Sequence, residues 1–126
     1  MKIQPLIIFL VVLLLTACVH SDDNILDTSL EVEIGTNTKE VSIWEPVIIW
    51  ATVKKGNTPV IEVEDIQFEI VKKGGVSIGV VNPENVGDGK YQIETMFDEV
   101  GIYQIISHVT VDGQHKMPNY EITIVQ

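Results

Sequence analysis

The sequence has little positive charge and a single cysteine. Its 126 residues include 8 lysines and arginines against 18 aspartates and glutamates, which gives a formal net charge of −10. So acidic a chain lacks the basic surface that contact with a phosphate backbone requires, and we expect no nucleic-acid partner. Because Cys18 is the only cysteine, it cannot form a disulfide within the chain. A folded domain must therefore be held together by apolar packing.

The patterns of common catalytic sites are also missing. No serine stands in a glycine elbow, and the acidic residues do not have the spacing of a calcium loop. The glycines of Gly74-Gly75 and Gly87-Asp88-Gly89 fall in expected turns and do not open a helix that could bind phosphate. We therefore expect a protein that is not an enzyme.

Residues 1–17 have the pattern of a secretion signal. After Lys2, every residue from Leu6 to Leu15 is Leu, Ile, Val or Phe. This run is too short for a transmembrane helix, which needs about 20 apolar residues, but it suits a signal peptide, which needs about 7 to 15. It ends in Leu15-Thr16-Ala17-Cys18, which resembles the bacterial lipobox. The resemblance implies cleavage before Cys18 and diacylation of its sulfur, for example with palmitate.

A lipidated Cys18 would determine where the protein resides. Two acyl chains hold a domain on a membrane far more firmly than one. Residues 18–29 are mostly polar after the cysteine, and we expect them to form a flexible tether with a reach of about 20 Å. The expectation is a lipoprotein on the extracytoplasmic face of the cell membrane, anchored and not spanning. The alternative is that Cys18 is an ordinary signal-peptide residue or a free thiol.

Residues 30–126 predict one all-β domain. Short runs of alternating apolar and polar residues recur between turn residues, and no stretch has a helical apolar period. About seven strands in a domain of this length favour an immunoglobulin-like antiparallel β-sandwich, with a barrel as the alternative. The expected strands cover residues 30–35, 41–44, 47–53, 60–71 with a break near 64–65, 76–81, 91–97, 103–111 and 120–124, and residues 82–88 are expected to form a loop.

One local motif favours the sandwich. Gly101-Ile102-Tyr103, preceded by Asp98, resembles the tyrosine corner, in which a tyrosine hydroxyl bonds back to the backbone a few residues upstream. Ile105 stands where antibody domains carry a cysteine, in agreement with the absence of a disulfide. The alternative is that Gly101 and Tyr103 simply begin a hairpin strand.

The C-terminal hairpin contains the candidate binding residues. Asp112-Gly113 is a preferred pair for a two-residue type I′ turn, which would place His115 opposite Thr110 and Met117 opposite His108. The same register sets Ile105 opposite Tyr120, an apolar pair, whereas a shift by one residue would set it opposite Glu121. His108, His115 and Met117 should therefore lie on one face, opposite to the core.

Two imidazoles and a thioether suit copper. Thioether sulfur selects Cu(I), and imidazole binds copper in either oxidation state. Zinc more often recruits cysteine or carboxylate ligands. The alternative is that His108, His115 and Met117 lie on a solvent-facing hairpin and bind nothing.

A family resemblance adds to this expectation. It is carried by Glu45-Pro46-Val47, Gly89-Lys90-Tyr91, Gly101-Ile102-Tyr103, and above all by His108-Val109 followed by His115-Lys116-Met117-Pro118. On these motifs, residues 30–126 resemble the YtkA-like domain of short lipoproteins from Bacillus-type bacteria, which is similar to FixH-like proteins. The resemblance implies an immunoglobulin-like sandwich with a role near membrane metal or respiratory-chain maturation. Many members carry a methionine before the second histidine, where this chain has Gln114, a departure that would remove one soft ligand.

These observations lead to two functional hypotheses. The first is a non-enzymatic, lipid-anchored binding module that captures or delivers copper at the membrane surface. The second is a metal-independent module that docks a membrane or respiratory-assembly partner through a sheet edge or a loop.

The lipobox can be tested by intact mass spectrometry of the protein extracted from membranes. We expect loss of residues 1–17 and addition of a diacylglyceryl group, and we expect Cys18→Ser to abolish the lipid. A wild-type protein secreted without lipid would show that the lipobox assignment is wrong.

Overall fold

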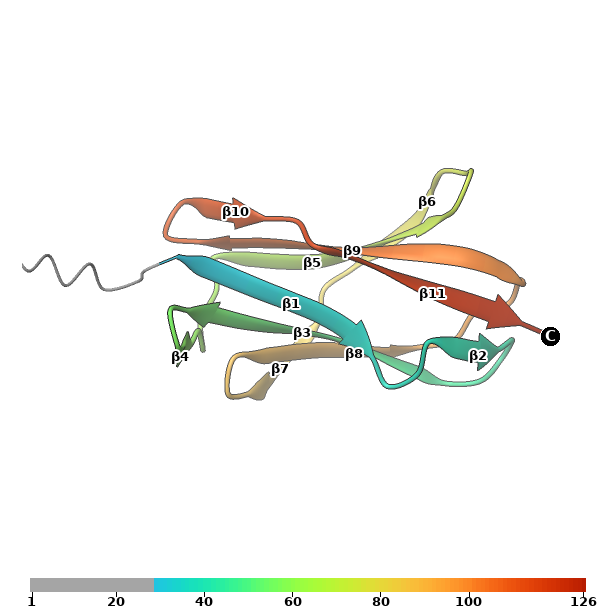
Figure 1. The fold of residues 1–126 in the computed structure, drawn as a ribbon, viewed down its shortest axis with the longest axis horizontal. Coiled ribbons are helices and arrows are strands. Elements are labelled where there is room, and N and C mark those ends of the chain that lie inside the picture. The colour runs from blue at the N-terminus through green and yellow to red at the C-terminus, as the bar shows by residue number, and fades with distance from the viewer. Residues whose placement is uncertain (1–28) are drawn as a thin grey trace, which may run out of the picture.

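The structure, a computed structural model, describes residues 29–126 (Figure 1). This part of the chain forms eleven strands, with no helix that is long and apolar enough to cross a membrane. The expected signal peptide of residues 1–17 lies outside the described residues, as does the expected tether of residues 18–29 except for Ser29.

The strands form two sheets that pack face to face. Sheet A has the order β1 (Leu30–Thr36), β3 (Val47–Lys55), β8 (Lys90–Thr95) and β7 (Glu84–Gly87), with β4 (Thr58–Pro59) paired to the end of β3. Sheet B has the order β2 (Glu40–Ser42), β11 (Asn119–Val125), β9 (Gly101–Val111), β5 (Asp65–Lys72) and β6 (Ser77–Val81), with β10 (Gln114–Lys116) paired to β9. Figure 1 shows the two layers, with the C-terminus at the end opposite to β1's first residue.

The predicted immunoglobulin-like sandwich is confirmed. Seven strands have five or more residues, namely β1, β3, β5, β6, β8, β9 and β11. The other four are short segments at the sheet edges and strand ends, and one of them, β2, adds a parallel pair with β11 to an otherwise antiparallel architecture.

Several expected strand limits were wrong by about two residues, as at residues 42–44, 54–55 and 96–97, and two regions differ more. The strand expected from residue 60 begins only at Asp65. In the preceding segment the Ile61 carbonyl accepts hydrogen bonds from the Tyr91 hydroxyl and the Asn85 side-chain amide, both at 2.7 Å, in place of a regular strand ladder. The loop expected over residues 82–88 contains β7, in which Asn85 pairs with Tyr91 of β8.

Strict alternation along the central strands builds the core. In β3, the four apolar side chains from Val47 to Val53 at odd positions are fully buried. In β9, every odd position from Tyr103 to Val111 is buried, and the even positions are more exposed. The two rows meet between the sheets and, with Phe68 and Ile122, exclude water from the interior. Burial of these aliphatic rows is the main source of stability in a domain without a disulfide.

The predicted tyrosine corner is present. The Tyr103 side chain is 2% exposed, and its hydroxyl donates a hydrogen bond of 3.0 Å to the carbonyl of Glu99. Its ring packs against Phe97, with ring centroids 4.7 Å apart. The contact ties the loop between β8 and β9 to the start of β9.

Removal of this hydroxyl tests its contribution to stability. Tyr103→Phe should lower the free energy of unfolding by about 1–2 kcal/mol, because the hydrogen bond to the Glu99 carbonyl is lost. Tyr120→Phe is the control, since this half-buried hydroxyl forms no hydrogen bond within residues 29–126. Urea unfolding measures both; equal values for the two variants would mean that the corner does not stabilise the domain.

Candidate functional site

A type I′ turn sets the geometry of the C-terminal hairpin. Asp112 and Gly113 have φ angles of 49° and 74°, as this turn requires. His115 lies opposite Thr110 in the β9–β10 pair, and beyond Met117-Pro118 the same register continues with Tyr120 opposite Ile105. The predicted register is thus confirmed, and it places Met117 level with His108.

The turn is also fastened to sheet A. Lys55 of β3 forms an ion pair with Asp112, with 2.5 Å between Nζ and Oδ2. The Leu30 amide donates a hydrogen bond of 3.2 Å to the Gln114 side-chain oxygen. Position 114 therefore points toward sheet A and away from His115. A methionine at this position would start from the same side of the strand as Gln114, opposite to His115.

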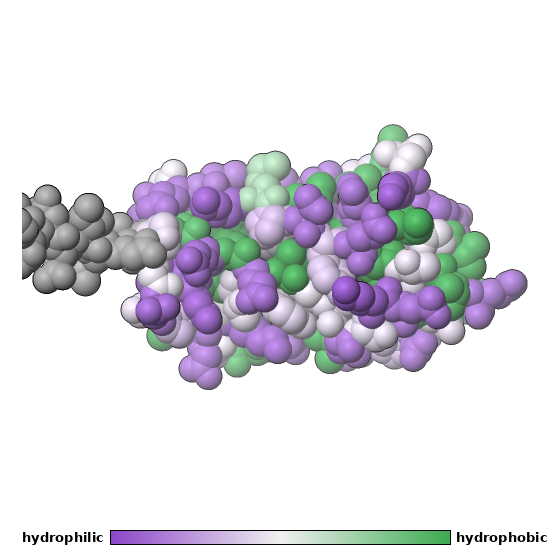
Figure 2. Space-filling view, in the orientation of Figure 1, coloured by the Kyte–Doolittle hydropathy of each residue, from purple (hydrophilic) through white to green (hydrophobic). Residues whose placement is uncertain are grey.

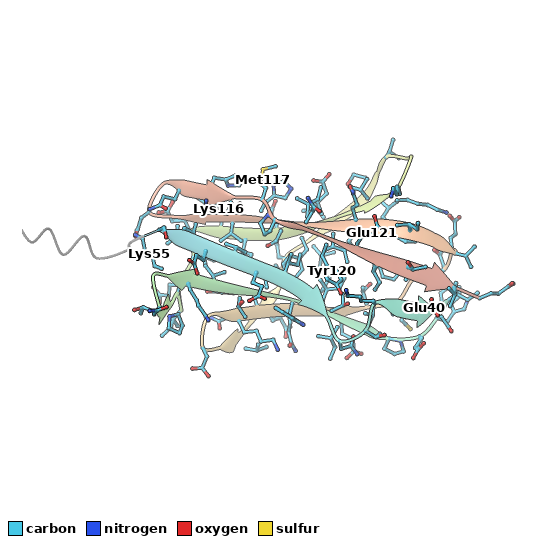
Figure 3. All side chains as sticks on the ribbon, in the orientation of Figure 1. Glu40, Lys55, Lys116, Met117, Tyr120 and Glu121 are labelled. Atoms are coloured by element: carbon cyan, nitrogen blue, oxygen red, sulfur yellow. The ribbon has the colours of Figure 1, made fainter. Side chains whose placement is uncertain are left out.

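His108, His115 and Met117 lie on the outer face of sheet B, which we call the histidine face. The two imidazole rings have centroids 5.9 Å apart and an interplanar angle of 34°. Met117 is 54% exposed, and Figure 3 shows its side chain on the side of sheet B away from sheet A. The predicted placement on one face is confirmed.

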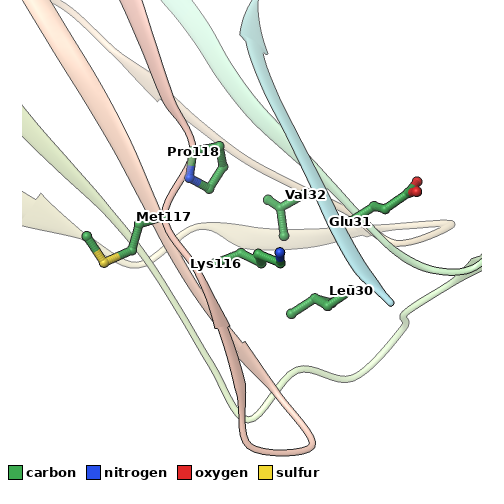
Figure 4. A pocket seen from close by; sticks show the side chains of 6 residues that line it. All are labelled: Leu30, Glu31, Val32, Lys116, Met117 and Pro118. Atoms are coloured by element: carbon green, nitrogen blue, oxygen red, sulfur yellow. The ribbon is translucent and has the colours of Figure 1, made fainter. Parts of the chain in front are cut away.

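A groove lies on the opposite side of the same segment. Its volume is about 480 Å³, and it is open to solvent between β1 and the strand segment after β10. In Figure 4 the side chains of Lys116 and Pro118 point toward β1, whereas that of Met117 points the other way. Met117 is among the residues that line the groove, but its side chain points toward the histidine face.

A carboxylate that sequence reasoning did not assign to the site holds His108. Glu69 of β5 accepts a hydrogen bond from His108 Nε2 at 2.9 Å, and both side chains are about one quarter exposed. This bond is the main reason why the pKa of the Glu69 carboxyl lies below its ordinary value of 4.5, against the opposing effect of burial and with a smaller contribution from Ser77. An ionised carboxylate can only accept, so Nε2 of His108 carries the proton.

His115 is held in a corresponding way. Its Nδ1 lies 2.8 Å from the Thr110 hydroxyl, its direct cross-strand neighbour. Within residues 29–126, the other ring nitrogens, Nδ1 of His108 and Nε2 of His115, form no hydrogen bond. Metal-binding histidines usually present one ring nitrogen to the metal while a neighbouring carboxylate, carbonyl or water holds the other. At His108 the partner is the Glu69 carboxylate, as in such sites. At His115 the partner is the Thr110 hydroxyl.

The donor set fits one class of metal better than others. In the described part of the chain, no three side chains from the group His, Cys, Asp and Glu are placed so that they could hold an ion together. A zinc or calcium site built in the usual way is thus not formed by these residues. The third protein donor available on the histidine face is the Met117 thioether, a soft ligand that favours Cu(I).

Comparison with known proteins supports the fold. The chain matches no protein-family model and no curated protein. Solved structures similar to it include an engineered protein (TM-score 0.64, 13% identity, 79% of this chain and 21% of that chain covered). Others are the PmoD soluble domain from Methylocystis sp. (Rockwell) (0.54, 10%, 75% and 90%) and the Lin-41 filamin domain (0.53, 14%, 75% and 91%). At these identities the likeness shows a shared β-sandwich and nothing finer.

The Glu69–His108 contact predicts a measurable titration. Carbon-detected NMR should give Glu69 a pKa below 4.5, and His108→Ala should raise it. Because the pKa is lowered in the folded state, ionised Glu69 stabilises the fold above its unfolded pKa, and this contribution is lost as the pH falls through the folded value.

Glu99 provides the internal control for this titration. The hydrogen bond from Lys72 lowers its pKa, and it should not respond to His108→Ala. A Glu69 pKa that is the same in both proteins would contradict the contact.

Proposed function

We propose that this protein is a YtkA-like, lipid-anchored lipoprotein on the extracytoplasmic face of the membrane, and that it binds copper on the histidine face without catalysing a reaction. The observation that carries the metal proposal is the pair of imidazoles, with ring centroids 5.9 Å apart, each of which has one nitrogen engaged by a neighbouring side chain. Such a pair is oriented before any ion arrives, so little side-chain entropy is lost on binding.

The residues would have distinct roles. His108 would coordinate through Nδ1 and His115 through Nε2, while Met117 supplies sulfur from the position level with His108. Glu69 and Thr110 would hold the rings in orientation, and the negative charge of Glu69 would raise the basicity of His108. The site is at the surface, so an ion bound there can be handed directly to another protein or membrane site.

Titration with Cu(I) under reducing conditions tests this proposal. The wild-type protein should bind about one equivalent, and His108→Ala, His115→Ala and Met117→Ala should each lose most of the affinity. Glu69→Gln should weaken binding by about tenfold or more, because it keeps the ligands and removes the carboxylate that orients one of them.

Two variants control for loss of any surface histidine or methionine. His20→Ala changes the expected tether, and Met96→Ala removes a thioether that is 56% exposed in the loop after β8. Both should bind as the wild type does. Weak binding that no histidine-face variant alters would contradict the site.

A specific feature favours the second hypothesis, a metal-independent docking module. Trp44 is 64% exposed and has a φ angle of 62°, which is unfavourable for so large a side chain. Its amide donates to the Phe97 carbonyl at 2.9 Å, so it lies beside the loop that carries exposed Met96 and Val100. If copper does not bind and a photo-crosslinker at position 44 couples to a single membrane protein, docking is the better description.

A further inference from the structure

Strand β6 is an edge strand with apolar side chains exposed on both faces. It pairs with β5 on one side only, and Ile78 and Val80 are 55% and 56% exposed, with Val76 just before the strand at 78%. The β5–β6 hairpin projects from the sandwich in Figure 1, and the same projection is green and white, not purple, in Figure 2. Its free edge presents unpaired backbone donors and acceptors among uncharged residues.

The other sheet edges in residues 29–126 differ from β6. β1 carries Glu31 and Glu33, while β2 has three residues and begins with Glu40, and β7 has four and begins with Glu84. Short length and charge are the usual means by which edge strands avoid pairing with other chains. β6 has five residues and no charge, and its one irregularity is a bulge at Ile78 in its pairing with β5.

We propose that β6 pairs antiparallel with β6 of a second copy of this chain, so that sheet B continues across the dimer. In a symmetric antiparallel pair, a residue must lie opposite its own copy at the twofold axis. With Gly79 at the axis, Ile78 lies opposite Val80 of the second copy and Ser77 opposite Val81, and the irregularity of the β5–β6 pair at Ile78 falls beside the axis. This register places Ile78 beside Val80 of the second copy on both sides of the axis.

Charge supports a second copy as the occupant in spite of the net charge of −10. Residues 74–83 contain no charged side chain, and Lys73 and Glu84 flank them. Antiparallel pairing brings the lysine end of one copy toward the glutamate end of the other at both ends of the interface, although Lys73 also forms an ion pair of 3.3 Å with Glu121 of its own chain and Glu84 begins β7 in sheet A. The edge is therefore complementary to itself, whereas a strand from another protein would need this charge pattern by coincidence.

The dimer would also place the two candidate copper sites on the same side of the continuous sheet. Val80 lies opposite Glu69 in the β5–β6 pair, so β6 borders the part of sheet B that includes Glu69 and His108. A twofold axis perpendicular to the continuous sheet keeps both histidine faces on the same side. This arrangement is independent of whether the histidine face binds copper.

Crosslinking of the full-length chain in membranes tests the proposal. No heavy atom lies within 4 Å of a Cβ added at Gly79, and its φ is outside the left-handed region, so Gly79→Cys should fold. Opposed residues in an antiparallel pair have Cα atoms about 4.5–5.5 Å apart, within the range of a disulfide. Mild oxidation with diamide should convert Gly79→Cys to a species of twice the monomer mass, and the control Val100→Cys, 50% exposed, should stay monomeric.

A charged residue in the strand completes the test. Ile78→Lys in the Gly79→Cys background should reduce the crosslinked species by about tenfold, because it places a charge opposite Val80 of the second copy, at a position that has no partner residue on β5. Ile61→Lys, a change at an apolar side chain that is 64% exposed outside β6, should leave it unchanged. Crosslinking no greater than that of Val100→Cys, or crosslinking of the Gly79→Cys variant to a different protein, would overturn the proposal.

Discussion

The alternation of side chains along β9 determines both the core and the position of the histidine face. Its odd positions from Tyr103 to Val111 are buried between the sheets, and its even positions face outward. A shift of one residue would expose the aliphatic row and bury His108, so the register is strongly determined. The tyrosine corner at Tyr103 holds one end of the strand, and the Asp112-Gly113 turn, tied to Lys55, holds the other. The position of the histidine face thus follows from the packing of the core.

The central position of β9 in sheet B brings side chains from two other strands beside His108. β5 lies on one side and supplies Glu69, while β10 lies on the other and supplies His115. His108 is therefore flanked by a carboxylate and a second imidazole that come from different strands. The two contacts orient the ring without any helix, disulfide or buried charge in the described residues, and the rigidity of the sheet maintains them.

The parts of this site that follow from local pairing could be predicted, and those that depend on distant pairing could not. A two-residue turn connects β9 to β10, so the sequence between Thr110 and His115 is enough to determine which residues face each other. Glu69 is 39 residues from His108 in the chain, and no turn determines how β5 aligns with β9. The alternation of Phe68 and Ile70 predicts that Glu69 faces outward but not which side chain it meets. β7 was missed for a similar reason, because its pairing with β8 is irregular around Asn85 and Gly87.

X-ray absorption at the copper edge of the Cu(I)-loaded protein would identify the donor atoms of the histidine face. We expect one sulfur and two imidazole nitrogens around the ion, with the sulfur absent in Met117→Ala and still present in Met96→Ala. A coordination sphere of nitrogen and oxygen alone in the wild-type protein, or one that is the same in Met117→Ala, would contradict this expectation.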